Sequence, residues 1–418
     1  ALVTHLGPRC ALGHAANHSH RLMNPATRLT REFLPDNAVQ LLVTGMHYFP
    51  ALITAIDNAA HEVHLETYIF ANDETAQSVA AALARAARRG VAVRVLVDGF
   101  GARDFVTGLG ATLIVDGVEL LVYRPQPRRR RLHWHRLRRL HRKLAVIDGS
   151  LAFIGGINII SDFDAGMVAP RFDFAVSIKG PLVNVIHANM RHVWHIVRWS
   201  RLGHRPHAPD FQPVPQPPAG IMQAALVIRD NLRHRRDIEE AYLQAIDNAQ
   251  KEIILANAYF LPGKHFREAL VAAAQRGVSV MLLLQGRADY VLQHHAMQSI
   301  YDSLLNAGVR IFEHQPSYLH AKVAVIDNEW ATVGSSNIDP FSLLLSREAN
   351  VIVRNHTFAL ELAAHLRSAI SQDAVEIHPG AHHRSWLMRQ INSAAYALVR
   401  LLVGMTGYGK HYTTPGNS

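Results

Sequence analysis

Short apolar segments alternate with amphipathic ones along this chain, and the alternation occurs twice. Apolar runs at 63–69 and 91–97 flank an Ala-rich stretch that ends at Arg-Gly, and runs at 253–259 and 278–284 flank a second one. Continuous Val, Ile and Leu runs between helical segments indicate strands that are buried on both faces. A glycine directly after a helical pattern is typical of a helix C-terminus. The pattern predicts an α/β fold in which each half is a mixed sheet sandwiched by helices.

The two halves are an internal duplication. Three pairs of segments match in the same order, about 180 residues apart: HEVHLETYIF at 61–70 and KEIILANAYF at 251–260, ALARAARRGVAVRVLVDGFG at 82–101 and ALVAAAQRGVSVMLLLQGRA at 269–288, and DGVELLVY at 116–123 and AGVRIFEH at 307–314. A repeat of this length indicates a doubled domain rather than a short-period solenoid. We therefore predict a first lobe at 37–203 and a second lobe at 221–384.

The segments outside these lobes differ in composition. The Pro-rich, polar stretch at 204–220 suits a linker between the lobes. Residues 1–36 form an N-terminal extension, of which 1–22 are expected to contribute little to the fold, since Met23 would be a natural start. The apolar tail at 385–418 is interrupted by arginines, and it either packs on the body or lies in a membrane interface.

The composition limits the function classes. The 418 residues favour two or more domains, and 43 Lys and Arg against 33 Asp and Glu give a formal charge of +10. A basic balance indicates an anionic partner, either nucleic acid or an acidic membrane surface. The single cysteine excludes a disulfide within the chain. No apolar run reaches the roughly 18 residues of a spanning helix, and the N-terminus is a poor signal peptide.

Each half also carries the same polar trio on an apolar run. RRLHRKLAVID and SYLHAKVAVID place a His, a Lys two residues later and an Asp five residues after the Lys; the residues are His141, Lys143 and Asp148, then His320, Lys322 and Asp327. A Gly and an Asn follow at the same distances in both copies, Gly155 with Asn158 and Gly334 with Asn337. On a strand, residues two apart point to one face, so each His–Lys pair projects together. If the lobes pack about a pseudo-twofold axis, both pairs meet at one cleft.

This set of side chains suits chemistry at phosphorus. Two ammonium groups and two Asn amides can hold phosphate oxygens and stabilise the charge that grows in the transition state. One imidazole can attack phosphorus while the other protonates the leaving oxygen. Zinc is the alternative for paired histidines, but a Lys beside each His repels a cation, and no Cys or close His pair completes a site. We therefore expect neither a metal nor an organic cofactor.

The doubled trio resembles the HKD motifs of the phospholipase D superfamily. Further segments, namely HLETYIF, LVDGFG, FIGGINI, ANAYFLPG and ATVGSSNIDPFSLLLSREANVIV, are similar to bacterial cardiolipin synthases of the short type that lacks N-terminal membrane helices. The resemblance spans residues 37–353. It implies a two-lobed fold with the active site at the pseudo-twofold interface, and a covalent phosphohistidine intermediate.

The resemblance also implies roles for individual residues. Asp173 and Glu348 would each orient the histidine of the opposite lobe through its second ring nitrogen, a surface salt bridge being the alternative. Asp148 and Asp327 would support the loop and the contacts between lobes without touching substrate. Glu66 would be a cleft glutamate whose repeat partner is Asn257, an asymmetry that fits two different substrate halves.

The resemblance further suggests that His141 attacks phosphorus, while His320 acts as acid and then as base. The near-symmetry of the two motifs does not decide this assignment.

The segment at 124–143 holds nine arginines, eight of which precede the first motif histidine. Such a run is usually a solvated surface. Beside a phosphoryl site it needs anions to neutralise it, and anionic lipid headgroups would do so, with Trp134 inserting at the interface. The phosphates of DNA are the rival partner.

Together these features predict a phosphatidyltransferase that makes cardiolipin from two phosphatidylglycerol molecules. It would bind peripherally to the cytoplasmic side of the bacterial inner membrane, without an obligate protein partner. A phosphodiesterase, nuclease or phospholipid hydrolase using the same site is the second hypothesis, although aromatic residues that could stack on bases are only 7% of the chain. A binding module with a dead site is the third, and the completeness of both motifs argues against it.

Overall fold

The computed structural model of the chain describes residues 30–125, 138–163, 167, 169–202, 213–230, 233–287, 291–339, 342, 346–379, 390–392, 394–398 and 401. The first 22 residues, most of the arginine run with Trp134, much of the Pro-rich linker and most of the apolar tail lie outside these ranges. Predictions made for those segments therefore remain predictions.

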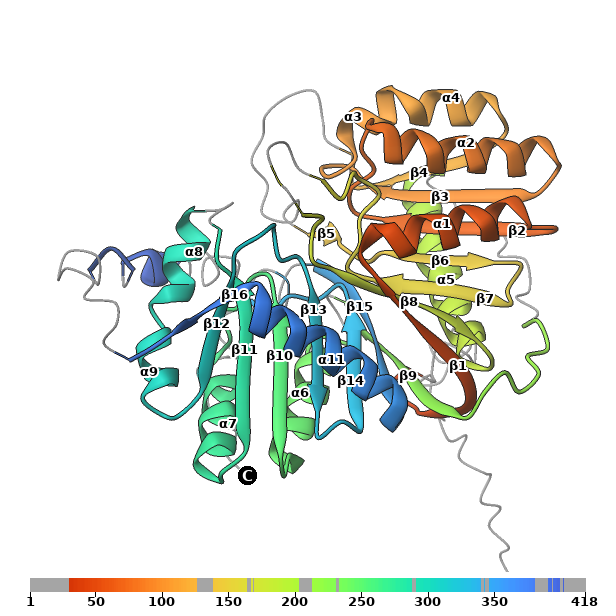
Figure 1. Ribbon diagram of the computed structural model, residues 1–418. Helices are drawn as coiled ribbons and strands as arrows, with labels where there is room; N and C mark the ends of the chain where they lie inside the picture. The colour runs from red at the N-terminus through yellow and green to blue at the C-terminus, as the bar shows by residue number, and fades with distance from the viewer. Residues whose placement is uncertain are drawn as a thin grey trace, which may run out of the picture.

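The two halves of the described chain have sheets with the same strand order (Figure 1). The first runs β4-β3-β2-β6-β7-β8-β1, and the second runs β12-β11-β10-β13-β14-β15-β9 with β16 added at its outer edge. In each sheet the first three strands are parallel and the rest antiparallel, so both sheets are mixed. The strands of the first half are β1 (Leu34–Val43), β2 (Glu62–Thr67), β3 (Ala92–Asp98), β4 (Glu119–Tyr123), β6 (Leu144–Ile147), β7 (Leu151–Gly155) and β8 (Phe174–Lys179). Those of the second half are β9 (Met222–Arg229), β10 (Glu252–Asn257), β11 (Ser279–Gln285), β12 (Arg310–His314), β13 (Lys322–Ile326), β14 (Trp330–Gly334), β15 (Ser346–Arg354) and β16 (Ala374–Ile377).

Helices cover both faces of each sheet. α1 (Thr44–Asp57) and α2 (Glu74–Arg88) pack with the outer face of the first sheet, and α6 (Asp237–Asn248), α7 (Lys264–Gln275) and α9 (Tyr301–Leu305) with that of the second. The inner faces of both sheets share one apolar core with α5 (Leu182–Leu202) and α11 (His356–Gln372). Three short helices are also described, namely α3 (Arg103–Thr107), α4 (Leu109–Val115) and α8 (Val291–Gln298).

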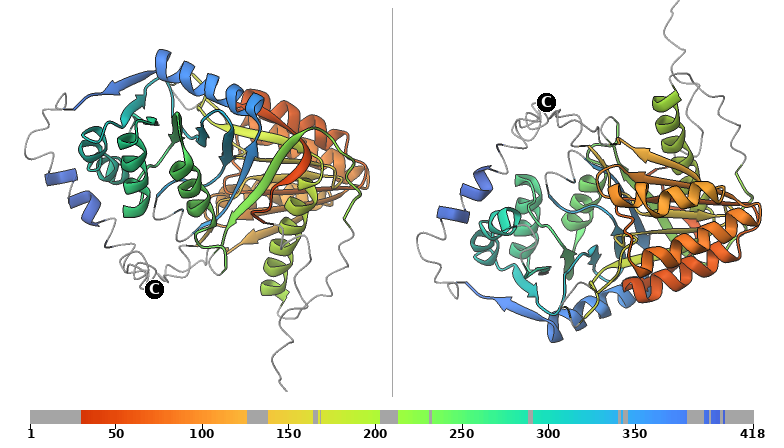
Figure 2. Two further views of the ribbon diagram at one scale, coloured as in Figure 1. Left: turned by 90° about the horizontal axis from the view of Figure 1, so that it is seen from below. Right: turned by 90° about the horizontal axis from the view of Figure 1, so that it is seen from above.

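The sheets join into one continuous structure. β1 pairs with β9 as well as with β8, so hydrogen bonds run from the first sheet into the second. α5 contacts β9 and α11 contacts β1, and Figure 2 shows the two halves side by side with α11 extending toward the first. The short strand β5 (Arg139–Leu140), just before the first motif histidine, pairs with β15 of the other half. The segment just before the first motif is therefore part of the junction between the halves.

The prediction of a duplicated α/β fold with helix-covered mixed sheets is confirmed. The four apolar runs correspond to β2, β3, β10 and β11, each displaced by no more than two residues at either end. The runs are mostly apolar because helices lie on both sides of these strands, which leaves no face for water.

Asp148 and Asp327 lie in the turns that end β6 and β13, at left-handed φ angles of 51° and 53°. The Asp148 carboxylate accepts hydrogen bonds of 2.8 Å from the backbone N–H groups of residues 60–62, and Asp327 accepts bonds of 2.8–2.9 Å from those of residues 250–252. Each Asp thus fixes the start of the neighbouring strand, as expected for loop support. The expected contact between lobes is wrong, because each carboxylate binds only its own half. Each Asp lies five residues of extended chain, about 16 Å, from the lysine of its own motif. Neither Asp therefore takes part in the reaction at the histidines.

Candidate active site

Each motif histidine is anchored by its backbone to the opposite half of the molecule. The N–H of His141 donates to the carbonyl of Arg347 at 3.0 Å, and the N–H of His320 donates to the carbonyl of Phe172 at 2.9 Å. The prediction that the histidines lie on the apolar strands is therefore wrong. Both precede those strands, which begin at Leu144 and Lys322, because their hydrogen bonds go to the other lobe instead of their own sheet.

The two carboxylates predicted to orient the histidines do pair with them across the junction. Nδ1 of His141 lies 3.1 Å from Oε2 of Glu348, and Nδ1 of His320 lies 2.6 Å from Oδ2 of Asp173. Glu348 is fully buried and Asp173 is 4% exposed, which excludes the alternative of surface salt bridges. With Nδ1 bound, Nε2 is the nitrogen of each ring that is left for chemistry.

The residues behind these carboxylates differ between the lobes. The Ser335 hydroxyl donates to Glu348 at 2.6 Å, whereas the matching position in the first lobe is Gly156, where a β-carbon would collide with Asp173. The larger Glu is thus held by a hydroxyl, and the smaller Asp fits over a glycine. Sequence reasoning missed both residues, although the aligned GGIN and GSSN segments already showed the difference.

The two motif lysines are buried and close enough to influence each other. Nζ of Lys143 donates to the carbonyl of His141 at 2.6 Å, and Nζ of Lys322 donates to that of His320. The pKa of Lys143 is lowered to about 7, chiefly by burial and also by the charge of Lys322, against the opposing charge of Glu348. Two lysines from different lobes therefore belong to one electrostatic site.

The histidines belong to the same site. Burial, then the charges of Lys322, Lys143 and His141, lowers the pKa of His320 well below its ordinary value. The pKa of His141 is also lowered, mainly by burial, against the opposing charge of Glu348. Burial raises the pKa of Asp173 to about 6. These shifts favour neutral imidazoles, and a bound anion would offset the effect of the lysines.

Tyr68 is a further component of the site. Its ring centroid lies 4.8 Å from that of His141, and Nζ of Lys143 lies 5.4 Å from the ring centroid. The aligned position in the second lobe is Ala258, so only the first histidine has an aromatic neighbour here. The signal was present in the aligned segments HEVHLETYIF and KEIILANAYF, where Tyr stands opposite Ala.

Asn158 and Asn337 are buried in the loops after β7 and β14. Oδ1 of Asn158 accepts a hydrogen bond of 3.2 Å from the N–H of Ile69, and Nδ2 of Asn337 lies 3.5 Å from the hydroxyl of Ser342. These contacts hold loops together, and phosphate binding by either amide stays a prediction.

Glu66 is not an open cleft glutamate. It is fully buried, and Nε of Arg142 donates to it at 2.8 Å while the same guanidinium also donates to Asn189. The expected repeat partner was wrong as well: Glu66 lies opposite Leu144 in its sheet, and the residue opposite the matching Val323 is Ala256. Since Arg142 matches Ala321, a buried ion pair in one lobe replaces two alanines in the other.

We expect Glu66→Ala to destabilise the protein by about 3–5 kcal/mol, because it leaves the Arg142 charge buried without its partner. The double variant Glu66→Ala, Arg142→Ala should recover part of that loss, since the second lobe packs with alanine at both positions. Chemical denaturation of the single and double variants measures the difference. A double variant less stable than the sum of the two singles would contradict this account.

Two features of the described residues bear on the site. No group of three or more His, Cys, Asp or Glu side chains in those ranges is placed to share a metal ion. None of the helices formed by the described residues is long and apolar enough to span a bilayer.

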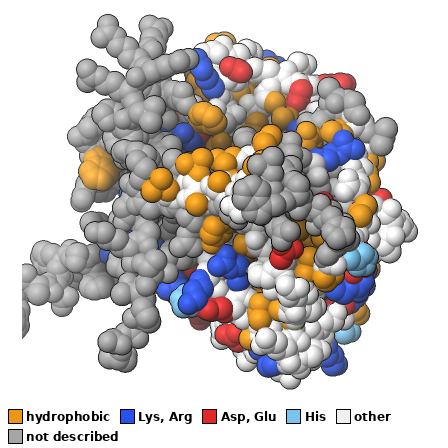
Figure 3. All heavy atoms as spheres, turned by 90° about the vertical axis from the view of Figure 1, so that its left-hand side faces the viewer, with side chains coloured by type: hydrophobic (Ala, Val, Ile, Leu, Met, Phe, Trp, Pro, Cys, Tyr) orange, Lys and Arg blue, Asp and Glu red, His pale blue; other side chains and the backbone are white. Residues whose placement is uncertain are grey.

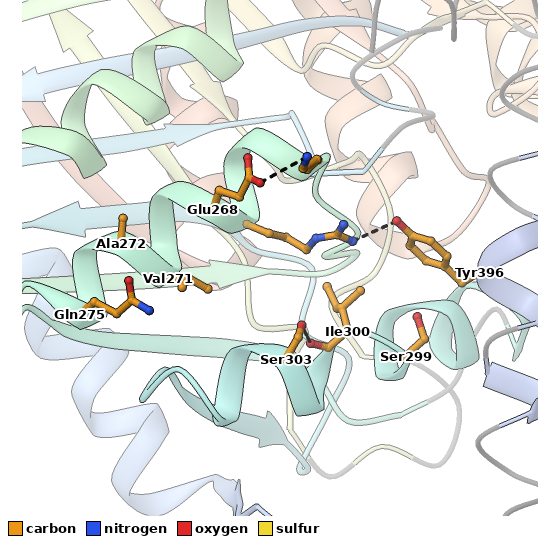
Figure 4. A pocket seen from close by; sticks show the side chains of 10 residues that line it. Glu268, Val271, Ala272, Gln275, Ser299, Ile300, Ser303 and Tyr396 are labelled. Carbon is orange, nitrogen blue, oxygen red and sulfur yellow. Dashed lines mark hydrogen bonds and ion pairs between the residues drawn. The ribbon is translucent and has the colours of Figure 1, made fainter. Parts of the chain in front are cut away.

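A surface cavity of about 710 Å³, separate from the histidines, lies between α7, α9 and Tyr396. The hydroxyl of Tyr396 accepts a hydrogen bond from Arg267 at 2.9 Å (Figure 4).

Known proteins share the sequence and the fold of this chain. The family model described as the phospholipase D-like domain of cardiolipin synthase matches residues 52–194 and 242–370. The chain is 38% identical over 378 residues to cardiolipin synthase B of Shigella flexneri, covering 89% of this chain and 90% of that one. It is 29% identical over 346 residues to a major cardiolipin synthase of Bacillus subtilis strain 168, covering 79% and 68%. The fold is similar to the crystal structure of phosphatidylserine synthase from Haemophilus influenzae Rd KW20, with a TM-score of 0.65, 12% identity and coverage of 92% and 98%.

Proposed function

Because the chain belongs to the cardiolipin synthase family of phospholipase D-like proteins, we propose that it is a phosphatidyltransferase that makes cardiolipin from two phosphatidylglycerol molecules and releases glycerol. The observation that carries this proposal is the pair of imidazole–carboxylate couples, each joining a histidine of one lobe to a buried carboxylate of the other, together with two buried lysines that influence each other.

In the first step, Nε2 of His141 attacks the phosphorus of one phosphatidylglycerol. The bond between phosphorus and the headgroup oxygen breaks, and that oxygen takes a proton from Nε2 of His320, so glycerol leaves. The phosphatidyl group stays on His141. Glu348 holds the attacking ring in the tautomer whose lone pair is on Nε2, and it stabilises the charge that the ring acquires.

In the second step, the headgroup hydroxyl of another phosphatidylglycerol gives its proton to His320 and attacks the same phosphorus. The N–P bond to His141 breaks, cardiolipin leaves, and both histidines return to their starting state. Lys143 and Lys322 stabilise the negative charge on the phosphoryl oxygens in both steps. Phosphatidylethanolamine as a donor or water as an acceptor would use the same site.

The bound phosphodiester has a second role in this scheme. Burial, together with the lysine charges, lowers the pKa of His320 well below its ordinary value, whereas a general acid must carry a proton. The anionic phosphate offsets the lysine charges and raises the pKa values of His320 and Lys143. Substrate binding therefore supplies the protonation state that the first step requires.

We expect the pH profile to reveal this coupling. kcat/KM for phosphatidylglycerol in mixed micelles should fall across the neutral range and more steeply above about pH 7, where Lys143 of the free enzyme loses its proton. The fall in kcat should lie at higher pH, because bound phosphate raises both pKa values. In Lys143→Arg, whose guanidinium stays charged, the steeper part should disappear. Identical alkaline limbs in kcat and kcat/KM would count against the scheme.

The substrate also places the protein at a membrane. We propose peripheral association with the cytoplasmic side of the bacterial inner membrane, supported by the formal charge of +10. No nucleic acid or obligate protein partner enters the proposal.

The function is tested by incubating purified protein with phosphatidylglycerol vesicles and, separately, with single-stranded DNA, and by mass spectrometry of lipids from cells that lack their own cardiolipin synthases. We expect cardiolipin and glycerol in the first incubation, cardiolipin in the complemented cells, and intact DNA. Phosphatidic acid alone would identify a hydrolase, and cleaved DNA without cardiolipin would identify a nuclease.

A further inference from the structure

We propose that the rim of the active site docks onto an anionic lipid bilayer through exposed apolar side chains contributed by both lobes. This docking rim consists of Met46, Phe100, Phe163, Val291 and Leu292, with Arg139, Arg171 and Arg287 among them. The inference rests on the proposed function, since it takes the substrate to be a bilayer lipid.

Phe100 marks the rim on the side of His141. It lies in the turn after β3 and is 55% exposed, with the guanidinium of Arg139 4.9 Å from its ring centroid. The Asp98 carboxylate accepts from the N–H groups of Phe100 and Leu140, both at 2.8 Å, and Leu140 directly precedes His141. One buried carboxylate therefore joins the backbone at Phe100 to the residue just before the first histidine.

Met46 and Phe163 mark the rim on the side of His320. The N–H of Thr44 donates to the carbonyl of Asp173 at 2.8 Å, which places the first turn of α1 beside the partner of His320. The Asp162 carboxylate accepts a hydrogen bond from the N–H of Gly45. Phe163 directly follows Asp162 and Met46 directly follows Gly45, so this contact joins the two segments that carry them. Both side chains point into solvent, with 62% of Met46 and 52% of Phe163 exposed.

The second lobe repeats this arrangement. Gln285 ends β11, the strand that matches β3, and its side-chain oxygen accepts from the N–H of Leu319, just before His320, at 3.3 Å. The helix that follows, α8, begins with Val291 and Leu292, which are 62% and 38% exposed. In Figure 1, α8 and α3 both project from the lobes on the side where β5 joins them.

The chemistry of the rim favours a bilayer over a protein partner. The apolar side chains come from separate segments of the chain, namely the start of α1, the turn after β3, the loop at Phe163 and the start of α8. Arginines accompany them: Arg287 is exposed and donates to the Gln315 carbonyl at 2.6 Å, and the backbone of Arg171 donates to Asp162. Scattered apolar groups among cations match a surface with acyl chains beneath anionic headgroups. Figure 3, which views the molecule from the side of α8, shows hydrophobic side chains exposed between basic ones.

The test compares the triple variant Met46→Ser, Phe100→Ser, Phe163→Ser with the control variant Ile114→Ser, Val115→Ser, Ile221→Ser. The control residues are 55%, 86% and 87% exposed, but they lie at the end of α4 and before β9, away from the motif histidines. The binding measurement is co-sedimentation with vesicles of phosphatidylglycerol and phosphatidylethanolamine. We expect the partition coefficient of the triple variant to fall at least about tenfold, and that of the control to stay within about twofold.

Activity separates docking from catalysis. The triple variant should lose cardiolipin synthesis on vesicles in parallel with binding, yet match the unaltered protein on short-chain phosphatidylglycerol dissolved below its critical micelle concentration. Undiminished vesicle binding by the triple variant, an equal loss in the control, or equal binding to phosphatidylcholine vesicles would overturn the proposal. A failure of the proposed function looks different, because the unaltered protein would then make no cardiolipin from either substrate form.

Discussion

Replacing His141 with Asn is expected to lower cardiolipin formation by at least about 10³-fold, because it removes the nitrogen that forms the covalent bond to phosphorus. Asn cannot attack the phosphodiester, while its size and polarity suit the partly exposed position beside Glu348. The measurement is initial-rate conversion of phosphatidylglycerol in vesicles. Comparison of unfolding midpoints shows whether the variant remains folded.

A trapping experiment decides which histidine attacks. With a phosphatidyl ester whose leaving group needs no proton, His320→Asn should still form the adduct on His141 but break it down slowly, since no base activates the incoming hydroxyl. His141→Asn should form no adduct. Peptide mass spectrometry locates the phosphatidyl group. An adduct on His320 in the His141→Asn variant would reverse the two roles, and the absence of any adduct in both single variants would argue for direct transfer.

The fold was predictable from the sequence because its determinants are local and repeated. Buried strands appear in the sequence as apolar runs, and the duplication fixes their order in both halves. The convergence of His141 and His320 could be argued from the doubled motif alone. Their attachment to Arg347 and Phe172 of the opposite lobe could not, because backbone pairing between distant segments leaves no periodic signal.

The misassignment of Glu66 has a different origin. A buried carboxylate with an arginine partner and a cleft carboxylate look the same in a single sequence. What separates them is the strand register, which aligns Glu66 with Ala256 and its partner Arg142 with Ala321. A residue-by-residue alignment of the two halves already contains this coupled replacement. Comparing the two halves position by position, instead of segment by segment, reveals this replacement. The same comparison also singles out Tyr68 and Ser335.

Glu348 and Asp173 are positioning residues, and substituting each carboxylate tests how it acts through its histidine. Glu348→Gln and Asp173→Asn are each expected to lower cardiolipin synthesis by about 10²- to 10⁴-fold. An amide can present its N–H to the imidazole, which favours the tautomer with the proton on Nε2 and removes the lone pair that reacts. Both variants keep the size of the side chain, so the Ser335 contact behind Glu348 and the close approach of Gly156 to Asp173 are preserved.

The two variants should nevertheless fail at different steps. Because Glu348 holds His141, Glu348→Gln should slow adduct formation with the activated phosphatidyl ester. Because Asp173 holds His320, Asp173→Asn should leave adduct formation with that ester within about tenfold and slow its transfer to phosphatidylglycerol. Glu313→Gln alters another buried carboxylate, one that accepts from the Tyr301 hydroxyl at 3.1 Å, and should leave both steps unchanged. Equal slowing of both steps in the two site variants would mean that the carboxylates shape the site as a whole and do not act each through its own histidine.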